Sequence, residues 1–186
     1  MDDNELVRNL QDGDKEAFKR LFDQYQHMVY NVCYRMTGNR QDAEDATQDV
    51  FLRIHHSIGQ FRSEAKLSSW ICRIAVNTCL NREQRRKLIR WVSLDFLVEN
   101  EGEFPLYLDQ APDRQMEKLQ TEHIVQEAIR ALPLRQRTAL VLQRYENLSY
   151  EEIALIMETS VSAVESLLGR AKENLAQKLV PLRNDL

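Results

Sequence analysis

Apolar residues recur every three or four positions through most of the chain, which is the spacing of one buried helix face. This pattern predicts a helix over residues 14–36, with Asp14 as its N-cap. A second helix is predicted with its buried side from Ala43 to Ile58 and its end at Gly59, and a third begins near Leu67. The 186 residues include only 5 Gly and 4 Pro, too few turn residues for a sandwich or barrel, so the predicted fold class is all-α.

The helical periodicity is interrupted between residues 91 and 113 and then resumes. The interrupted segment carries acids, prolines and no base, which is typical of a linker. It is also longer than the ~12–15 residues of a structureless loop inside one compact domain. We therefore predict two small helical domains, residues 1–90 and residues 115–186, joined by an acidic linker over residues 91–114.

The second domain contains the pattern of a helix-turn-helix. Ser149 and Glu152 have the spacing of a capping box, which predicts a short helix from Tyr150 to Met157. After a brief turn a longer helix is expected, capped by Ser160 or Ser162. A short helix followed by a longer one is the arrangement that places a recognition helix in the DNA major groove, although plain helical hairpins share it.

Charge is unevenly distributed along the chain, and this changes the expected partners. The net charge is −4, from 29 acidic and 25 basic residues, which taken alone does not suggest a nucleic-acid-binding protein. Acidic residues cluster over residues 42–49 and basic residues over 82–90, so we expect different partners for different parts of the chain. No apolar run reaches ~18 residues and the first residues are acidic, so the protein is expected to be soluble and cytoplasmic.

The sequence offers little that could support catalysis. Its three cysteines, Cys33, Cys72 and Cys79, lack CxxC spacing, and its four histidines form no ligand set, so neither a disulfide framework nor a metal site is expected. A glycine-rich phosphate loop and a nucleophile elbow are also missing. We therefore predict no enzymatic activity, no catalytic residue, no cofactor and no small-molecule substrate.

Two sets of motifs resemble those of a known family. The segments DAEDATQDVF (residues 42–51) and LSSWICRIAVN (residues 67–77), with Phe61 between them and a basic run after them, resemble conserved region 2 of the extracytoplasmic-function sigma factors. The segments that resemble region 4 of this family are LP (132–133), Arg137, LSYEEIA (148–154), VSAVES (161–166) and RAK (170–172). The resemblance covers nearly the whole chain apart from the predicted linker.

This resemblance implies a bacterial transcription initiation subunit of the sigma-70 type. Such a protein binds core RNA polymerase, recognises the −10 and −35 elements of promoter DNA and helps to open the duplex. Members of the family are commonly held inactive by an anti-sigma factor, often membrane-anchored, so an anti-sigma factor is a further expected partner.

The acidic helix is the expected polymerase contact under this resemblance. Asp42, Asp45 and Asp49 are spaced by three and four residues, so they share one helix face, with Gln48 beside them. In the family, the equivalent helix docks on the clamp-helix coiled coil of the largest polymerase subunit, which assigns these four residues to polymerase binding. From the residues alone, a solvated acidic face is the alternative.

The resemblance also implies a pocket that holds a flipped −10 base between the loop and the third helix. The matching positions are Arg53, Ser57, Phe61 and Asn77. Phe61 is expected in an exposed polar loop, and its alternative is an anchor tucked into the core. The basic residues expected to contact phosphates are Arg82, Arg85, Arg86 and Lys87. They are too dense to be paired internally by Glu83 alone, and a solvated helix end is their alternative interpretation.

The outward positions of the predicted recognition helix are expected to contact the −35 element. These positions are Ser162, Ala163, Glu165, Ser166, Gly169, Arg170 and Lys172. Glu165 either accepts a hydrogen bond from cytosine or completes a capping box with Ser162. Inside a helix, Gly lowers stability by ~1 kcal/mol relative to Ala. A close approach to DNA or to a neighbouring helix would explain why a glycine occupies position 169.

Two other functions are consistent with part of this pattern. One is an ordinary helix-turn-helix regulator that binds a DNA palindrome as a dimer without polymerase. The other is a protein-interaction adaptor with no DNA role. A sigma factor binds core polymerase one to one, so the stoichiometry of that binding distinguishes it from an ordinary regulator. Promoter-specific transcription in a reconstituted assay distinguishes a sigma factor from an adaptor.

Overall fold

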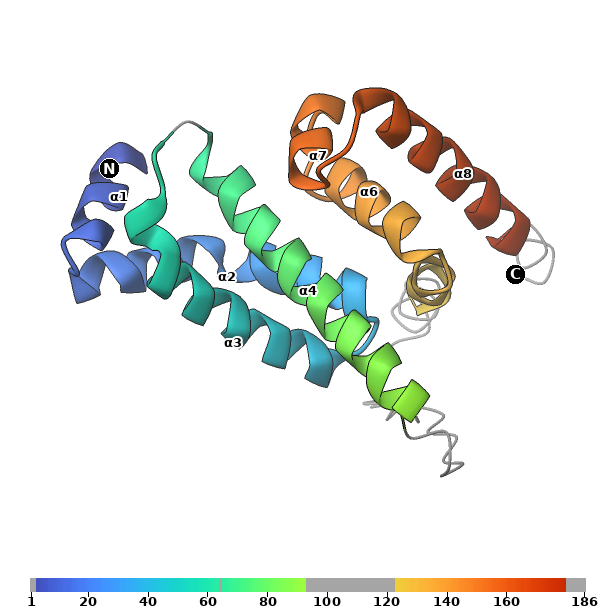
Figure 1. Ribbon diagram of the computed structural model, residues 1–186, viewed down its shortest axis with the longest axis horizontal. Helices are drawn as coiled ribbons and strands as arrows, with labels where there is room; N and C mark the ends of the chain where they lie inside the picture. Colours follow the sequence, from blue (N-terminus) through green and yellow to red (C-terminus); the bar gives the residue numbers. More distant parts are fainter. Residues whose placement is uncertain (1–2, 64, 93–122, 180–186) are drawn as a thin grey trace, which may run out of the picture.

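The helices of the N-terminal half lie at one side of the molecule and those of the C-terminal half at the other (Figure 1). The structure, a computed structural model, describes residues 3–63, 65–92 and 123–179. Its named elements are α1 (Asp3–Gln11), α2 (Lys15–Thr37), α3 (Arg40–Ser57), the 3₁₀ helix η1 (Ile58–Gln60), α4 (Leu67–Val92), α6 (Leu134–Arg144), α7 (Tyr150–Ile156) and α8 (Val161–Leu179). Residues 123–130 are also helical, and no strand occurs within the described ranges, so the predicted all-α fold class is confirmed.

The N-terminal half is a bundle in which α2, α3 and α4 pack on one another. Asp14 caps α2 as predicted, because its side chain accepts a hydrogen bond from the Glu16 N–H at 2.9 Å. Gly38 ends α2 in the left-handed conformation, with φ +81°. The predicted end of α3 at Gly59 is wrong: α3 stops at Ser57, and Gly59 lies inside η1.

The C-terminal half contains the predicted helix-turn-helix, formed by α7 and α8. The capping box is present, since the Ser149 N–H donates to Glu152 Oε2 at 2.9 Å and the Glu152 N–H donates to Ser149 Oγ at 3.2 Å. Ser160 begins α8, because its hydroxyl accepts from the Ala163 N–H at 3.2 Å. Ser162 lies inside α8 and does not cap it.

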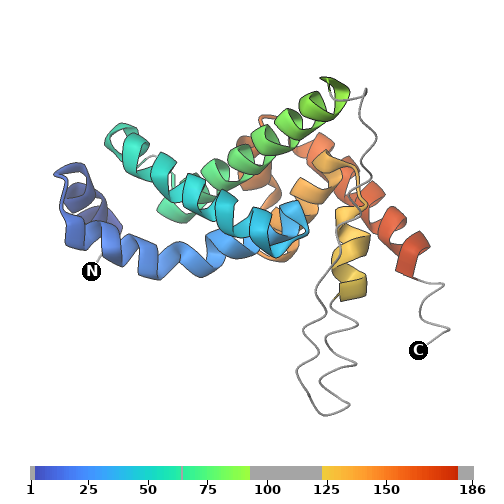
Figure 2. The ribbon, with the colours of Figure 1, turned by 90° about the horizontal axis from the view of Figure 1, so that it is seen from below.

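The two halves contact each other where α2 meets α6 and where α4 meets α7. Figure 2 shows the end of α2 beside α6. Arg35 Nη1 donates to Gln126 Oε1 at 3.0 Å, and its guanidinium lies 3.9 Å from the centroid of the Tyr145 ring. Arg73 Nη2 lies 2.6 Å from Glu158 Oε1. The predicted linker falls almost entirely outside the described residues, and α4 continues two residues past the predicted domain boundary at 90.

Candidate nucleic-acid interface

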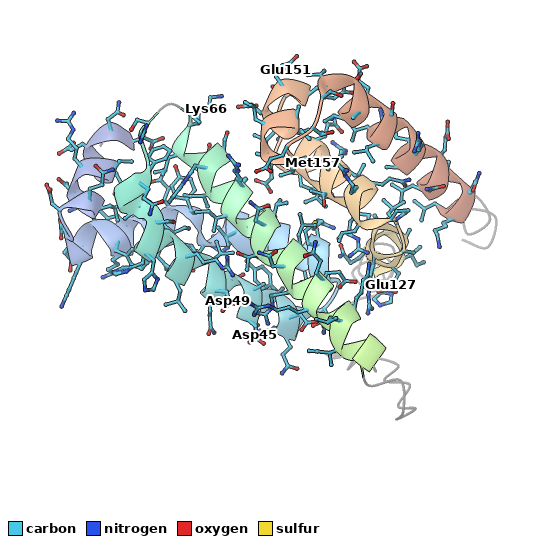
Figure 3. The ribbon with its side chains drawn as sticks, in the orientation of Figure 1. Asp45, Asp49, Lys66, Glu127, Glu151 and Met157 are labelled. Carbon is cyan, nitrogen blue, oxygen red and sulfur yellow. The ribbon has the colours of Figure 1, made fainter. Side chains whose placement is uncertain are left out.

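The acidic helix α3 and the basic part of α4 form a row of ion pairs, here called the α3/α4 seam (Asp42, Asp45, Asp49, Arg82 and Arg86). Arg82 Nη1 donates to Asp49, and its Nη2 lies 3.4 Å from Asp45 Oδ2. Arg86 Nη2 lies 2.5 Å from Asp42 Oδ2. Figure 3 labels Asp45 and Asp49 where α4 crosses α3.

The seam overturns one expectation about the basic run. Glu83 is not its sole internal partner, because the packing of α3 on α4 brings carboxylates to Arg82 from residues 33 and 37 positions away in sequence. Lys87 Nζ lies 4.0 Å from Glu83 Oε1. Arg85 is exposed and makes no ion pair within the described part of the chain.

The four predicted polymerase-binding residues differ in how exposed their side chains are. The side chains of Asp45 and Asp49 are 54% and 45% exposed, and Gln48 is exposed between them. The Asp42 side chain is only 19% exposed. Its carboxylate also contacts the side chain of Asn39, which caps α3 by accepting from the Asp42 N–H at 2.8 Å. Asp42 therefore organises the start of α3, whereas the other three face outward.

Three of the four residues predicted to hold a flipped base line one open pocket of about 450 Å³. Arg53 and Ser57 come from the end of α3, and Asn77 comes from the facing side of α4. Ser57 Oγ donates to the Arg53 carbonyl oxygen at 2.6 Å. The Asn77 amide is exposed and has no hydrogen-bond partner among the described residues, so it can both donate to and accept from a ligand.

Two further side chains, His56 and Ile74, line the same pocket and were missed by sequence reasoning. Their spacing carried a signal, because Ile74 lies three residues before Asn77 on α4 and His56 lies three residues after Arg53 on α3. The pocket combines a guanidinium, a hydroxyl, an imidazole and an amide with one apolar side chain. This combination suits a planar group that has a polar edge.

The expectation that Phe61 is an exposed loop side chain is wrong. Phe61 is 8% exposed, and its ring centroid lies 5.1 Å from that of Trp70. Gln11 Nε2 donates to the Phe61 carbonyl oxygen at 3.0 Å, which ties the loop to α1. Phe61 does not line the pocket, so the structure supports the alternative interpretation, a loop anchor packed into the core.

The outward face of α8 is open. Of the seven positions predicted to contact DNA, Ala163 is half-buried and the other six are exposed. The capping box proposed for Ser162 and Glu165 is absent, because α8 begins two residues before it would require. A Cβ atom added to Gly169 would meet nothing within 4 Å, so no neighbouring helix accounts for this glycine.

The cysteines are buried inside the first half. Burial, with a smaller effect of Glu146 and Glu152, raises the pKa of Cys72 to about 12. A hydrogen bond between Cys33 and Cys79 lowers the pKa of Cys33 and raises that of Cys79. Within the described ranges, no three His, Cys, Asp or Glu side chains gather closely enough to hold a metal ion.

None of the helices that the structure describes has both the length and the apolar character needed to cross a membrane.

Two protein families match separate parts of this chain. Residues 21–89 match the family described as Sigma-70 region 2. Residues 122–175 match the family described as Sigma-70, region 4. The first match contains the α3/α4 seam and the pocket, and the second contains the helix-turn-helix.

Curated relatives match almost the full length. The chain is 36% identical to the RNA polymerase sigma-H factor of Pseudomonas aeruginosa, over 97% of this chain and 95% of that protein. It is also 36% identical to the ECF RNA polymerase sigma-E factor of Haemophilus influenzae, over 97% of this chain and 96% of the relative. A similar fold occurs in the sigma factor RpoE of Bartonella quintana, which was solved in complex with the anti-sigma factor NepR. The TM-score is 0.69 and the identity 21%, and the match covers 87% of this chain and 96% of that one.

Proposed function

This chain belongs to the extracytoplasmic-function (ECF) sigma-70 factors, and from this membership we propose which of its surfaces carry out each step of promoter recognition. As a member of the family it binds core RNA polymerase and promoter DNA and directs promoter-specific transcription initiation. It is an initiation factor and not an enzyme.

The pocket between α3 and α4 is our proposed site for a −10 base that has left the duplex. The observation that carries this assignment is the gathering of Arg53, Ser57 and Asn77 around one cavity beside the apolar Ile74. A protein that opens DNA must compensate for lost stacking, and it does so by holding the unstacked base with edge hydrogen bonds and apolar contact. The free amide of Asn77 is suited to the base edge.

The outward part of the seam is our proposed polymerase contact. Asp45, Gln48 and Asp49 share the exposed face of α3, and Leu52, 59% exposed, continues that face by one turn. An apolar side chain among carboxylates supplies the contact area that charge pairs alone lack. Asp42 would act indirectly, because its carboxylate is held by Asn39 and Arg86.

In this scheme the protein binds polymerase first, and Arg82 and Arg86 then contact DNA phosphates. Each arginine is occupied by a carboxylate of α3 in the free protein. A basic polymerase surface that takes over Asp45 and Asp49 would leave Arg82 free for DNA. The two carboxylates paired with Arg82 are about half exposed, and exposed ion pairs are worth only ~0–1 kcal/mol, so their exchange costs little.

The second domain is our proposed −35 reader, through the exposed face of α8. Arg170 and Lys172 can neutralise phosphates there, while Glu165 can accept from a cytosine amino group in the major groove. Because α8 carries few cations, we expect tight promoter binding only when both domains are held on polymerase, where the second contact is effectively intramolecular.

An anti-sigma factor is a further proposed partner, and the cytoplasm is the proposed site of action, since the protein works on RNA polymerase. The family resemblance supports this partner, and the similar RpoE of Bartonella quintana was solved in complex with one.

A reconstituted transcription assay tests the proposed function. Purified protein and core polymerase should form a one-to-one complex that produces transcripts from a cognate promoter, and core polymerase alone should produce none. The ordinary-regulator alternative predicts sequence-specific binding to a palindrome without polymerase. Such binding, together with the absence of promoter-dependent transcripts, would overturn the proposal.

A further inference from the structure

A basic pocket of about 200 Å³ lies where the two halves of the molecule meet. Its lining residues are Thr37, Glu83, Arg86, Lys87, Arg130 and Arg137. They come from the end of α2, from α4, from the helical residues 123–130 and from α6. The proposed −10 and −35 surfaces use neither Arg130 nor Arg137.

Arg137 forms no ion pair with any carboxylate among the residues that the structure describes. Its Nη1 donates to the Met36 carbonyl oxygen at 2.5 Å, and its Nη2 donates to the carbonyl oxygens of Arg130 and Leu132. Its Nε is buried without a hydrogen-bond partner, and it makes no ion pair within the described residues. Burial lowers the pKa of Arg137, and the nearby Arg130 lowers it further against the opposite effect of Glu83.

The neighbouring carboxylates form ion pairs, two of them long, with the other cations of the pocket. Glu83 lies 4.0 Å from Lys87, and Glu127 lies 3.6 Å from Arg130. Arg86 is held by Asp42 of the seam. Among the described residues, four cations therefore face three carboxylates, which leaves an excess positive charge beside the half-buried guanidinium of Arg137. Figure 3 labels Glu127 at the junction of the two halves.

Gly38 lets Arg130 reach this position. Its left-handed conformation, φ +81°, is one that residues with a side chain rarely adopt. A Cβ atom at position 38 would lie 2.5 Å from Arg130 Cδ, so the stem of Arg130 packs against the backbone of Gly38 where a side chain would obstruct it. The pocket is thus built from backbone geometry as well as from charge.

We propose that this junction pocket binds the phosphate group of a small ligand, such as inorganic phosphate or a diphosphate. Guanidinium groups match phosphate oxygens with paired N–H donors, and the pocket brings three of them together with one lysine. Its volume accommodates one or two phosphate groups with a few waters, since a water occupies ~30 Å³ in the liquid. The ligand supplies the missing negative charge to both halves at once, so it stabilises their contact and raises the melting temperature.

Calorimetric titration of the full-length protein with pyrophosphate and with inorganic phosphate tests this proposal, at an ionic strength held constant with sodium chloride. We expect one saturable site per chain. Arg130→Gln should weaken binding at least ~10-fold, because a hydrogen bond to a charged group is worth ~1.5–3 kcal/mol. The matched control is Arg135→Gln, which removes the same charge from an exposed position on α6 outside the pocket and should leave affinity unchanged.

Glu83→Gln provides a test in the opposite direction, because removing the one carboxylate that lines the pocket should tighten binding. Equal weakening by Arg130→Gln and Arg135→Gln would show a general charge effect and overturn the proposal. Arg130-dependent binding of duplex DNA of unrelated sequence without any binding of pyrophosphate would also overturn it, in favour of a DNA backbone contact. The measurement needs neither polymerase nor promoter, so this proposal can fail while the initiation function stands.

Discussion

The two surfaces proposed for promoter DNA differ in how many of their charges are already paired within the described residues: Arg85 alone of the four basic residues in the first half makes no ion pair. In the first half, Arg82 and Arg86 are held by carboxylates of α3. On α8, Glu165, Arg170 and Lys172 are exposed and make no ion pair with any described residue. We therefore expect the seam to exchange partners when it binds DNA, whereas α8 can meet DNA without breaking an ion pair among the described residues.

This difference links polymerase binding to DNA binding in one half only. A ligand that occupies Asp45 and Asp49 removes the competitor of Arg82 for phosphates, and a phosphate on Arg82 frees the carboxylates for polymerase. Because such coupling is reciprocal, each partner should strengthen the binding of the other by the same factor. Among the described residues, no ion pair joins α8 to the acidic face, so we expect this coupling in the first half alone.

Charge reversal on the acidic face should produce the largest effect. We expect Asp45→Lys together with Asp49→Lys to weaken binding to core polymerase at least ~10-fold, because like charges then meet across the interface and close charge pairs couple by ~1.5–7 kcal/mol. The helical content should not change, since both side chains are about half exposed and the exposed ion pairs that they lose with Arg82 are worth only ~0–1 kcal/mol. Fluorescence anisotropy with labelled protein and circular dichroism measure the two quantities.

A charge swap separates the polymerase contact from the internal ion pair. Asp49→Lys with Arg82→Glu restores an opposite-charge pair between α3 and α4 but leaves the wrong charge facing polymerase. Core binding should stay weak in this double variant. Recovery of wild-type affinity would show that Asp49 acts only by holding Arg82 and would remove its assignment as a polymerase contact.

Asn77 tests the pocket, which lies beside the seam but contains no ion pair. Asn77→Ala should reduce open-complex formation by ~1–3 kcal/mol, the value of a base-edge contact, and should change closed-complex affinity less. Permanganate footprinting of the holoenzyme on a cognate promoter measures opening. Asn81→Ala is the matched control, because Asn81 is exposed one turn further along α4 and outside the pocket. Full rescue of Asn77→Ala by a premelted template would mean that Asn77 helps to form the bubble but does not hold the captured base.

Local signals in the sequence predicted the helices well and the contacts between them poorly. The capping residues Asp14, Ser149 and Glu152 are confirmed because a cap depends on neighbours within three residues. The ion pairs of Arg82 depend instead on how α3 packs against α4, which the spacing of charges within one helix does not reveal. Phe61 was misjudged for the same reason, since its burial depends on Trp70 and on α1.

The sequence predicted the residues of the proposed −10 pocket better than it predicted the ion pairs of the α3/α4 seam. Its members from α3 and α4 meet because both helices turn buried stripes toward α2, so the flanking positions converge at the edge of the bundle. Family resemblance supplied Arg53, Ser57 and Asn77, and packing supplied His56 and Ile74. The pairing of the acidic face with the basic run could not be inferred from either source.

Glu165 tests whether an unpaired charge on α8 reads DNA. Glu165→Ala should relax discrimination at one −35 position by ~1–3 kcal/mol in holoenzyme binding to a set of single-base promoter variants. Stability should change by less than ~0.5 kcal/mol, because Glu165 takes no part in the cap of α8. Glu173→Ala removes the same charge from another exposed position of the helix and should leave base preference unaltered. An equal loss of discrimination in both variants would assign the effect to net charge and not to a base contact.

Substitution of Gly169 should produce the smallest of these effects. It tests whether the outward face of α8 has room for an added side chain. Because a Cβ atom there meets nothing within 4 Å, Gly169→Ala should raise the free energy of unfolding by ~1 kcal/mol, the difference between the two residues inside a helix. The reverse change, Ala176→Gly, should lower it by a smaller amount, because Ala176 lies in the last turn of α8. If the glycine is retained so that α8 can approach the DNA backbone closely, Gly169→Ala should also weaken holoenzyme binding to the promoter several-fold while the protein becomes more stable. Higher stability with unchanged promoter affinity would show that the added methyl group faces solvent in the complex as well, and would place the DNA contact of α8 nearer its start, around Ser162 and Glu165.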